Sequence, residues 1–398
     1  MFDARHWKNA ALGELADISS GESLPATLRN GPFDLMGANG SIGRAAKCNF
    51  DGGVLVGRVG AAGEVSRILE PCWVSDNALM VRPKSDRLSS RYAFHLLNNL
   101  GLNSIATKTA QPLVTQSQLR GLQLFLPELV DEQAAIADLL DTLDTQIQKT
   151  EALIAKLEKV KEGLLHDLLT RGIDENGQLR PSPEEAPELY KESPLGLIPR
   201  EWQYGQLQDF GQLVSGQHIP GELSNRDGRG VPYFTGPTDF YSGQTITSSY
   251  TEFPQAMCSK GDLLITVKGS GCGKTATAST DACISRQLMA FSFKGVEQVF
   301  WRAFFSANEN MINRIAEGGA IPGISRQQLL HIPAASPTSE YEFNAISETI
   351  AAHEKRQFLE ARQLKKLNKQ KSGLMGDLLT GRIRVSPLLE PAEAATPA

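Results

Sequence analysis

The chain has 398 residues, of which 41% are apolar and 21% charged, and these values exclude a mini-protein and a wholly disordered chain. No stretch approaches the roughly 18 uninterrupted apolar residues of a membrane span, and the opening MFDARHWKNAALGEL lacks the basic start and apolar core of a signal peptide. We therefore expect a cytoplasmic protein with no membrane partner. The net charge of -5 excludes nucleic-acid binding through overall charge alone, so any such binding must come from placed cations and from partner subunits.

The chain contains an internal repeat. Residues 110–173 align with residues 320–383 at a constant offset of 210, with 19 identities in 64 positions and no gap. Looser similarity continues upstream, where WKNAALGELADISSG at 7–21 resembles WQYGQLQDFGQLVSG at 202–216. The sequence therefore predicts one unit of roughly 190 residues, present twice.

In chain order, the first element is a mixed α/β domain over residues 1–130. Short β-branched or alternating runs such as VLVGRV are separated by Gly, Pro, Asn and Asp, and a short helix is expected near 91–100. Residues 131–173 follow as a long amphipathic helix, just after the start signal Pro127. Residues 174–200 are polar and hold five prolines, which is typical of a linker.

The second half repeats this order. Residues 201–338 have the pattern of a second α/β domain, with helical stretches near 300–312. Residues 339–385 have the pattern of a second long helix, which begins just after Pro337. The last residues, 386–398, are predicted to form a disordered tail.

The two long helices carry apolar stripes with heptad spacing, which predicts that they pair. The stripe positions are Ile136, Leu140, Leu143, Ile147, Ile154, Leu157, Leu164 and Leu168 in the first helix, and Ile346, Ile350, Leu364, Leu367, Leu374 and Leu378 in the second. The second stripe also contains His353 and Glu360, so its seam is more polar. Two helices of equal length in one chain favour an α+β fold with an internal pseudo-twofold repeat, in which the helices form an intramolecular antiparallel coiled coil. A plain core stripe or a homodimeric coiled coil is the alternative, and the linker is long enough for a parallel pair.

The segment GSGCGKT at 269–275 resembles a phosphate-binding P-loop but is one residue short, because Lys268 stands where that motif needs its first glycine. It aligns with GRVGAAGE at 57–64, which has no lysine. This favours a glycine-rich turn after a strand, with Lys268 and Lys274 directed at DNA phosphates. A nucleotide-binding enzyme that uses Gly269–Thr275 is the alternative.

No catalytic or metal-binding constellation is evident. The five cysteines include no C-x-x-C pair, so we expect free thiols, and the six histidines are scattered. A G-x-S-x-G elbow, a methyltransferase cofactor loop and an Asn-Pro-Pro-Tyr motif are all missing from the sequence. We expect no catalytic residue, no metal and no cofactor in this chain.

The order of motifs is similar to that of the DNA specificity subunits of type I restriction-modification systems over about residues 5–385. The matching segments are LGELADISSG at 12–21, GANGSIG at 37–43, AQPLVTQSQLRGLQLFLP before DEQAAIADLL, and ESPLGLIPREW at 192–202. The chain departs from the family pattern at 334–343, where AASPTSEYEF replaces a proline-rich start with Glu-Gln.

The resemblance implies a non-catalytic subunit that binds double-stranded DNA. Its two target recognition domains would each read one half of an asymmetric bipartite sequence, and the helices would set the gap and dock two modification subunits. Those subunits would transfer methyl from S-adenosylmethionine to adenine N6, and restriction subunits would use ATP and Mg. A methyltransferase-only or type II-like assembly is an alternative, as is a non-DNA scaffold built on the coiled coil.

Direct readout of bases requires Arg or Lys for guanine and Asn or Gln for adenine. The candidate DNA-binding residues are Asn39, Arg58, Lys108 and Gln111 in the first domain, and Arg226, Arg229, Lys268, Lys274, Arg286 and Gln287 in the second.

Overall fold

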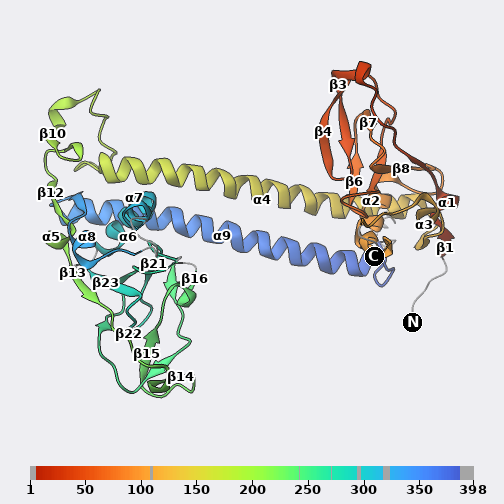
Figure 1. Cartoon of the computed structure of the whole chain (residues 1–398). Helices are drawn as coiled ribbons and strands as arrows, with labels where there is room; N and C mark the ends of the chain where they lie inside the picture. Colours follow the sequence, from red (N-terminus) through yellow and green to blue (C-terminus); the bar gives the residue numbers. More distant parts are fainter. Residues whose placement is uncertain are drawn as a thin grey trace, which may run out of the picture. The chain divides into compact units, whose positions relative to one another are not determined.

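The computed structural model of the protein describes residues 6–107, 111–241, 243–269, 271–293, 297–316 and 323–385. The chain divides into two compact units, the first made of Met1–Ala152 with Arg362–Ala398 and the second of Leu153–Ala361 (Figure 1). Each unit contains one α/β domain, the start of one long helix and the end of the other. No helix in the described part of the chain is long and apolar enough to span a membrane.

The first unit is built from short strands and helices around a single main core. Its elements are β1 (Trp7–Ala11), α1 (Leu12–Leu15), β2 (Ala16–Ser20), β3 (Arg29–Gly37), β4 (Gly40–Ala45), β5 (Gly53–Gly57), β6 (Val65–Ile68), β7 (Cys72–Val74), β8 (Ala78–Pro83), α2 (Ser90–Asn99), α3 (Gln116–Arg120) and β9 (Gln123–Pro127). The sheets have the orders β2-β8-β5-β6, β4-β3-β7 and β1-β9. Val54, Val81 and Leu96 belong to the buried core, which Leu140 and Leu378 of the long helices also enter.

The second unit has the same plan with more strands. Its elements are β10 (Tyr190–Ser193), β11 (Gly196–Pro199), β12 (Gln203–Gln206), α5 (Leu207–Phe210), β13 (Gln212–Ser215), β14 (Ser224–Asn225), β15 (Val231–Phe234), β16 (Phe240–Tyr241), β17 (Gln244–Thr245), β18 (Tyr250–Thr251), β19 (Met257–Cys258), β20 (Leu263–Thr266), β21 (Thr275–Thr277), β22 (Ala282–Ile284), β23 (Leu288–Ser292), α6 (Glu297–Ala307), α7 (Glu309–Ala316), α8 (Arg326–Leu330) and β24 (Pro333–Ser336). The sheets have the orders β13-β23-β20-β21-β17-β16, β14-β18-β15-β22-β19, β12-β24 and β10-β11.

The sheet topology confirms the duplication. The order β2-β8-β5-β6 of the first unit recurs as β13-β23-β20-β21 in the second, and the parallel pair β3 and β7 recurs as β15 and β22. The register also agrees, because Val54 faces Val81 in one unit and Leu263 faces Phe291 in the other. The capping box of α3 (Thr115 with Gln118) recurs in α8, again at the offset of 210.

The two long helices are α4 (Val130–Thr170) and α9 (Glu340–Leu378), and their segments run antiparallel within each unit. In the first unit Glu132 pairs with Arg384 and Asp144 with Lys371, so the partner number falls as the number in α4 rises. In the second unit Lys161 pairs with Glu354, and the Ile173 amide donates to Glu342. The pairs Asp144–Lys371 and Lys161–Glu354 occupy equivalent positions of the repeat.

None of the heptad-stripe side chains is exposed. Those that are buried are Ile136, Leu140, Ile147, Leu157, Leu168, Ile346, Ile350, Leu367 and Leu378, and the other five are half-buried. The polar residue His353 is accommodated because its Nε2 lies 3.0 Å from the Leu157 carbonyl oxygen, to which it donates a hydrogen bond. Glu360 is half-buried.

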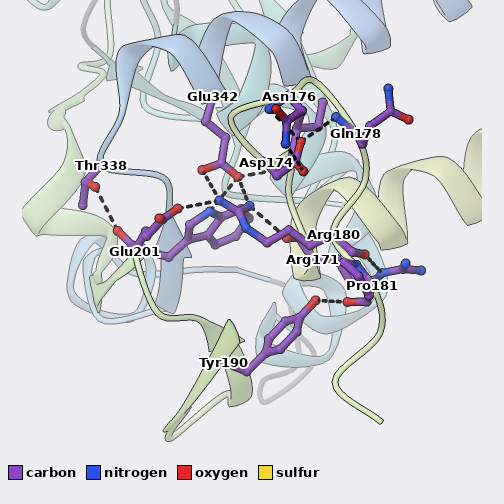
Figure 2. Close-up of polar contacts among 12 residues, drawn as sticks. Arg171, Asp174, Asn176, Gln178, Arg180, Pro181, Tyr190, Glu201, Thr338 and Glu342 are labelled. Carbon is purple, nitrogen blue, oxygen red and sulfur yellow. Dashed lines mark hydrogen bonds and ion pairs between the residues drawn. The ribbon is translucent and has the colours of Figure 1, made fainter. Parts of the chain in front are cut away.

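Residues 174–200 connect α4 to β12, but they are folded rather than extended. They form the β10–β11 hairpin, and Arg180, Tyr190 and Ile198 are buried in the second unit. Figure 2 shows Arg180 between two carboxylates: its Nη2 donates to Glu201 at 2.8 Å and to Glu342 at 3.1 Å. This part of the chain is therefore a packed connection, not an extended linker. The predicted tail, 386–398, lies outside the described residues.

The two long helices begin differently. In α4 the buried Gln133 accepts a hydrogen bond from the Ser89 amide at 2.8 Å and donates one to the Pro127 carbonyl at 2.9 Å. The equivalent of Gln133 in α9 is Phe343, which packs edge-on against Phe300 with 5.3 Å between ring centroids. The departure seen in the sequence is thus the exchange of a polar anchor for an aromatic one, and both anchors are buried.

Candidate nucleic-acid interface

Four loops of the first domain meet beside the ends of β5 and β7, and we call them loop cluster 1 (residues 38–39, 58–59, 76–77 and 111–114). The Arg58 amide donates to the Asn77 carbonyl at 2.8 Å, and the Val114 amide donates to the Arg58 carbonyl at 3.0 Å. Gly57 approaches Ala38 so closely that a Cβ there would lie 3.0 Å from the Ala38 carbonyl oxygen. Backbone contacts therefore hold the four loops together, which leaves their side chains free to vary.

The second domain repeats this arrangement as loop cluster 2 (residues 236–237, 267–268, 286–287 and 323–324). The Val267 amide donates to the Gln287 carbonyl at 2.8 Å, and the Ile324 amide donates to the Val267 carbonyl at 2.9 Å. These bonds are the counterparts of the two bonds in loop cluster 1. The same backbone frame is thus built twice.

A close approach between two backbone segments supports each cluster. Gly21 donates to the Ala78 carbonyl at 3.0 Å, and Gly216 donates to the Leu288 carbonyl at the same distance. A Cβ at either glycine would lie 2.1 Å from a backbone oxygen, that of Ser75 or Ser285, so both positions require glycine. This close approach explains the SG dipeptides that end the similar segments at 7–21 and 202–216.

Most of the sequence-predicted residues fall in these clusters or beside them. Loop cluster 1 contains Asn39 and Gln111, both exposed, and the half-buried Arg58, whose Nη1 lies 3.5 Å from the Asp76 carbonyl oxygen. Loop cluster 2 contains Lys268, Arg286 and Gln287, all exposed, and Lys274 is exposed at the other end of the loop that contains Lys268. Lys108 lies outside the described residues.

Arg226 and Arg229 are not brought to loop cluster 2 by any described contact. They lie in the turn between β14 and β15, where Asn225 accepts hydrogen bonds from the amides of Asp227 and Arg229, both at 3.1 Å. Arg229 is also 3.6 Å from the Asp227 carboxylate. These two arginines therefore form a separate exposed site.

Sequence reasoning missed Asp76 and Asn77, which are exposed and occupy the positions of Arg286 and Gln287. Asp76 Oδ2 accepts a hydrogen bond of 2.9 Å from Ser23. The signal in the sequence is weak, because at the offset of 210 the segments 72–81 and 282–291 share only Ser75 and Ser285. The matching backbone bonds establish the equivalence, since the Asn77 and Gln287 carbonyls accept from the Arg58 and Val267 amides.

The glycine-rich segment at 267–274 is the loop of a β-hairpin. β20 and β21 on either side of it are antiparallel, and the Thr266 amide donates to the Lys274 carbonyl at 2.9 Å. A P-loop needs a helix N-terminus directly after its glycines to receive the phosphate. A strand follows in this chain, so the structure gives no support to the nucleotide-binding alternative.

The described residues contain one grouping with the spacing of metal ligands: His95, Asp141 and Asp144. Cations of the protein already occupy it, because Arg67 and Arg91 donate to Asp141 at 2.9 and 2.7 Å and Lys371 is 2.5 Å from Asp144. Burial would raise the pKa of Asp141, but the hydrogen bonds from Arg67, His95 and Arg91 lower it to about 2. We interpret the grouping as an ion network that joins α2 and β6 to α4, not as a metal site.

Comparison with known proteins agrees with this architecture. The family profile for the type I restriction modification DNA specificity domain matches residues 4–159 and 199–369, one match for each copy of the repeat. The chain therefore belongs to the family of type I restriction-modification DNA specificity subunits.

The five cysteines, which the sequence predicted to be free thiols, form no disulfide in the structure.

Two proteins of similar sequence are also named as specificity subunits of type I restriction enzymes. The chain is 28% identical over 318 residues to the protein named as the specificity subunit of type I restriction enzyme MjaX of Methanocaldococcus jannaschii, over 78% of this chain and 72% of that one. It is 31% identical over 146 residues to the EcoprrI specificity subunit of Escherichia coli, over 35% and 36% of the two chains. The solved S subunit from M. genitalium superposes with a TM-score of 0.66 at 18% identity, over 94% of this chain and 96% of that one. At that identity the likeness shows the fold alone.

Proposed function

We propose that each α/β domain reads one half of an asymmetric bipartite DNA sequence, and that α4 and α9 set the gap between the halves and dock two modification subunits. In this proposal the chain has no catalytic role. The modification subunits bind S-adenosylmethionine and methylate adenine N6, and restriction subunits use ATP and Mg.

The observation that supports this proposal is the set of backbone hydrogen bonds that both loop clusters share. The backbone bonds of Arg58 and Val267 are equivalent, whereas the side chains at the ends of the loops differ: Asp76 and Asn77 in one cluster, Arg286 and Gln287 in the other. Two readers of different base sequences need this combination, because base edges are distinguished by the donors and acceptors that side chains present. A scaffold that served folding alone would not need different polar groups at equivalent exposed positions.

Exchanging the first domain tests whether the halves are read independently. If residues 6–128 are replaced with the corresponding domain of another specificity subunit, the methylated sequence should change in one half only, because no loop of cluster 2 is altered. Sequencing of methylated DNA from cells that express the chimaera with its modification subunit gives the answer. A change in both halves would contradict independent readout.

A single substitution tests the loop cluster itself. Arg286→Ala removes an exposed guanidinium from loop cluster 2, and affinity for the target should fall about ten- to hundred-fold, with discrimination relaxed in one half-site, since one bidentate base contact contributes about 1–3 kcal/mol. Lys260→Ala, an exposed cation of the same domain that precedes β20 whereas the cluster residues 267–268 follow it, is the control. Competition binding with single-base variants of the target measures both. Equal effects of the two variants would argue against a special role for the cluster.

A further inference from the structure

The outer face of α9 carries a basic stripe that α4 lacks. Arg362, Lys365, Lys366 and Lys369 are all exposed, and at 3.6 residues per turn they fall within an arc of about 100°. The buried seam residues Leu367 and Leu378 lie on the other side of the helix. We call these four cations the α9 stripe; together with Gln370 they line a depression of about 380 Å³.

The stripe has no counter-charge. Residues 361–376 contain no Asp or Glu, and among the described residues no carboxylate lies within ion-pair distance of the four side chains. The one other cation in this stretch, Lys371, points to the seam and pairs with Asp144. Four neighbouring unpaired cations repel one another, so the stripe is complementary to a polyanion.

The repeat makes the stripe more than an ordinary solvated face. At the offset of 210, Arg362 and Lys365 correspond to Ala152 and Ala155 of α4, while Lys366 and Lys369 correspond to lysines. The acidic Glu158 and Glu162 of α4 are replaced by Asn368 and Ser372 in α9. The seam is thus kept in both helices, whereas positive charge has accumulated on one of them only.

We propose that the α9 stripe contacts the phosphates of the non-specific DNA between the two half-sites, an inference that rests on the function proposed above. The stripe lies close to the middle of α9, which in that function accompanies the gap. The four cations span about 10 Å of helix, and over that length a duplex carries about six phosphate charges. Phosphate contacts carry no sequence information, which suits a gap of arbitrary sequence.

A protein partner is a poorer fit to the stripe. Protein interfaces are organised around buried aromatic and apolar anchors and are depleted in lysine. Among the described residues of α9, the exposed large apolar side chains are Tyr341, Phe358 and Leu359, and none of them lies between the cations of the stripe, although Phe358 continues the same face one turn before Arg362. The stripe offers charge without an apolar centre.

The test uses the complete complex with its modification subunits and a fluorescent duplex that carries the methylated target, with binding measured over a series of salt concentrations. Arg362→Gln, Lys365→Gln, Lys366→Gln and Lys369→Gln together should lower the slope of log Kd against log salt by up to about 3.6, or about 0.9 per phosphate contact. The drop should be the same on an unrelated duplex, and the methylated sequence should not change.

The repeat supplies a matched control. Lys366→Gln with Lys369→Gln should lower the slope by up to about 1.8. Lys156→Gln with Lys159→Gln, at the equivalent exposed positions of α4, should leave it unchanged. Equal slopes for all variants, or equal losses in the two double variants, would overturn the proposal. Reduced co-assembly with the modification subunit at an unchanged slope would also overturn it, and would identify the stripe as a protein contact.

This design separates the two proposals. If wild-type complex does not prefer the target over unrelated DNA, the proposed function fails, but the slopes on unrelated DNA still test the stripe. If wild-type complex prefers its target and the stripe variants keep the wild-type slope, only the stripe proposal fails.

Discussion

Replacing Glu342 with alanine is expected to destabilise the second unit by about 3–5 kcal/mol, the usual cost of breaking a buried ion pair on one side. Glu342 is 3% exposed and Arg180 is 5% exposed, so removal of the carboxylate leaves a buried guanidinium without its main partner. The Ile173 amide at 2.9 Å and the Trp202 Nε1 at 3.0 Å lose their acceptor as well. Hydrogen exchange followed by mass spectrometry should show lower protection in the second unit and unchanged protection in the first.

Two further variants serve as controls for this prediction. Glu340→Ala removes an exposed carboxylate near the start of α9 and should cost less than about 1 kcal/mol. Replacing both Glu342 and Arg180 with methionine should recover part of the stability lost in Glu342→Met, because no charge is then left buried. If Glu342→Ala were as stable as Glu340→Ala, the polar network in Figure 2 would not contribute to the stability of the second unit.

The first unit contains a similar buried ion pair at the start of its long helix. Glu132 is fully buried at the start of α4, and Arg384, which follows α9, donates to it at 2.7 and 3.0 Å. In each unit, therefore, a buried glutamate in the first turn of one long helix is bound by an arginine that follows the end of the other. This arrangement explains why the chain after each helix folds back instead of leaving the unit.

The alignment of the two halves matches the two glutamates but not their partners. Glu132 and Glu342 stand among the identities of the repeat, whereas the same offset places Asp174, not Arg180, opposite Arg384. The two arginines reach equivalent carboxylates from non-equivalent positions, so no alignment of the halves could reveal them. The fold of 174–200 escaped prediction because its burial depends on contacts with Glu342 of α9 and with Glu201 and Trp202, which local composition does not encode.

The residue types of the candidate interface could be chosen from the sequence, but only some of their positions could. Choosing Arg, Lys, Asn and Gln in loops after expected strands selected Arg58, Lys268 and Arg286, which the structure places in the two loop clusters, and their contact with DNA stays a prediction. It passed over Asp76 because a carboxylate is an uncommon partner for DNA, although it can accept a hydrogen bond from cytosine N4. The backbone hydrogen bonds that the two clusters share identify that position. These bonds form only when the strands are paired.

The helix pair leads to the second large expected effect, a change in the length of the DNA gap. One heptad inserted after Ala152 in α4 and another after Ala361 in α9 fall at the junction of the two units, so the pairs Asp144–Lys371 and Lys161–Glu354 are both kept. Each helix becomes longer by about 10 Å, and its apolar stripe stays in register because the insertion equals the repeat. A heptad in α4 alone, which leaves the two helices unequal, is the control and should abolish activity.

On the proposed function, the insertion in both helices should lengthen the non-specific gap by up to about three base pairs, given about 3.4 Å per base pair, and by less if the helices are inclined to the duplex. Each added base pair also turns the second half-site by roughly 34°, which the docked modification subunits must follow, so some methylation activity should be lost. Sequencing of methylated DNA should show unchanged half-sites with a longer gap. An unchanged gap in a folded, active variant would show that the helices do not set the distance, and new bases within the half-sites would show that they take part in readout.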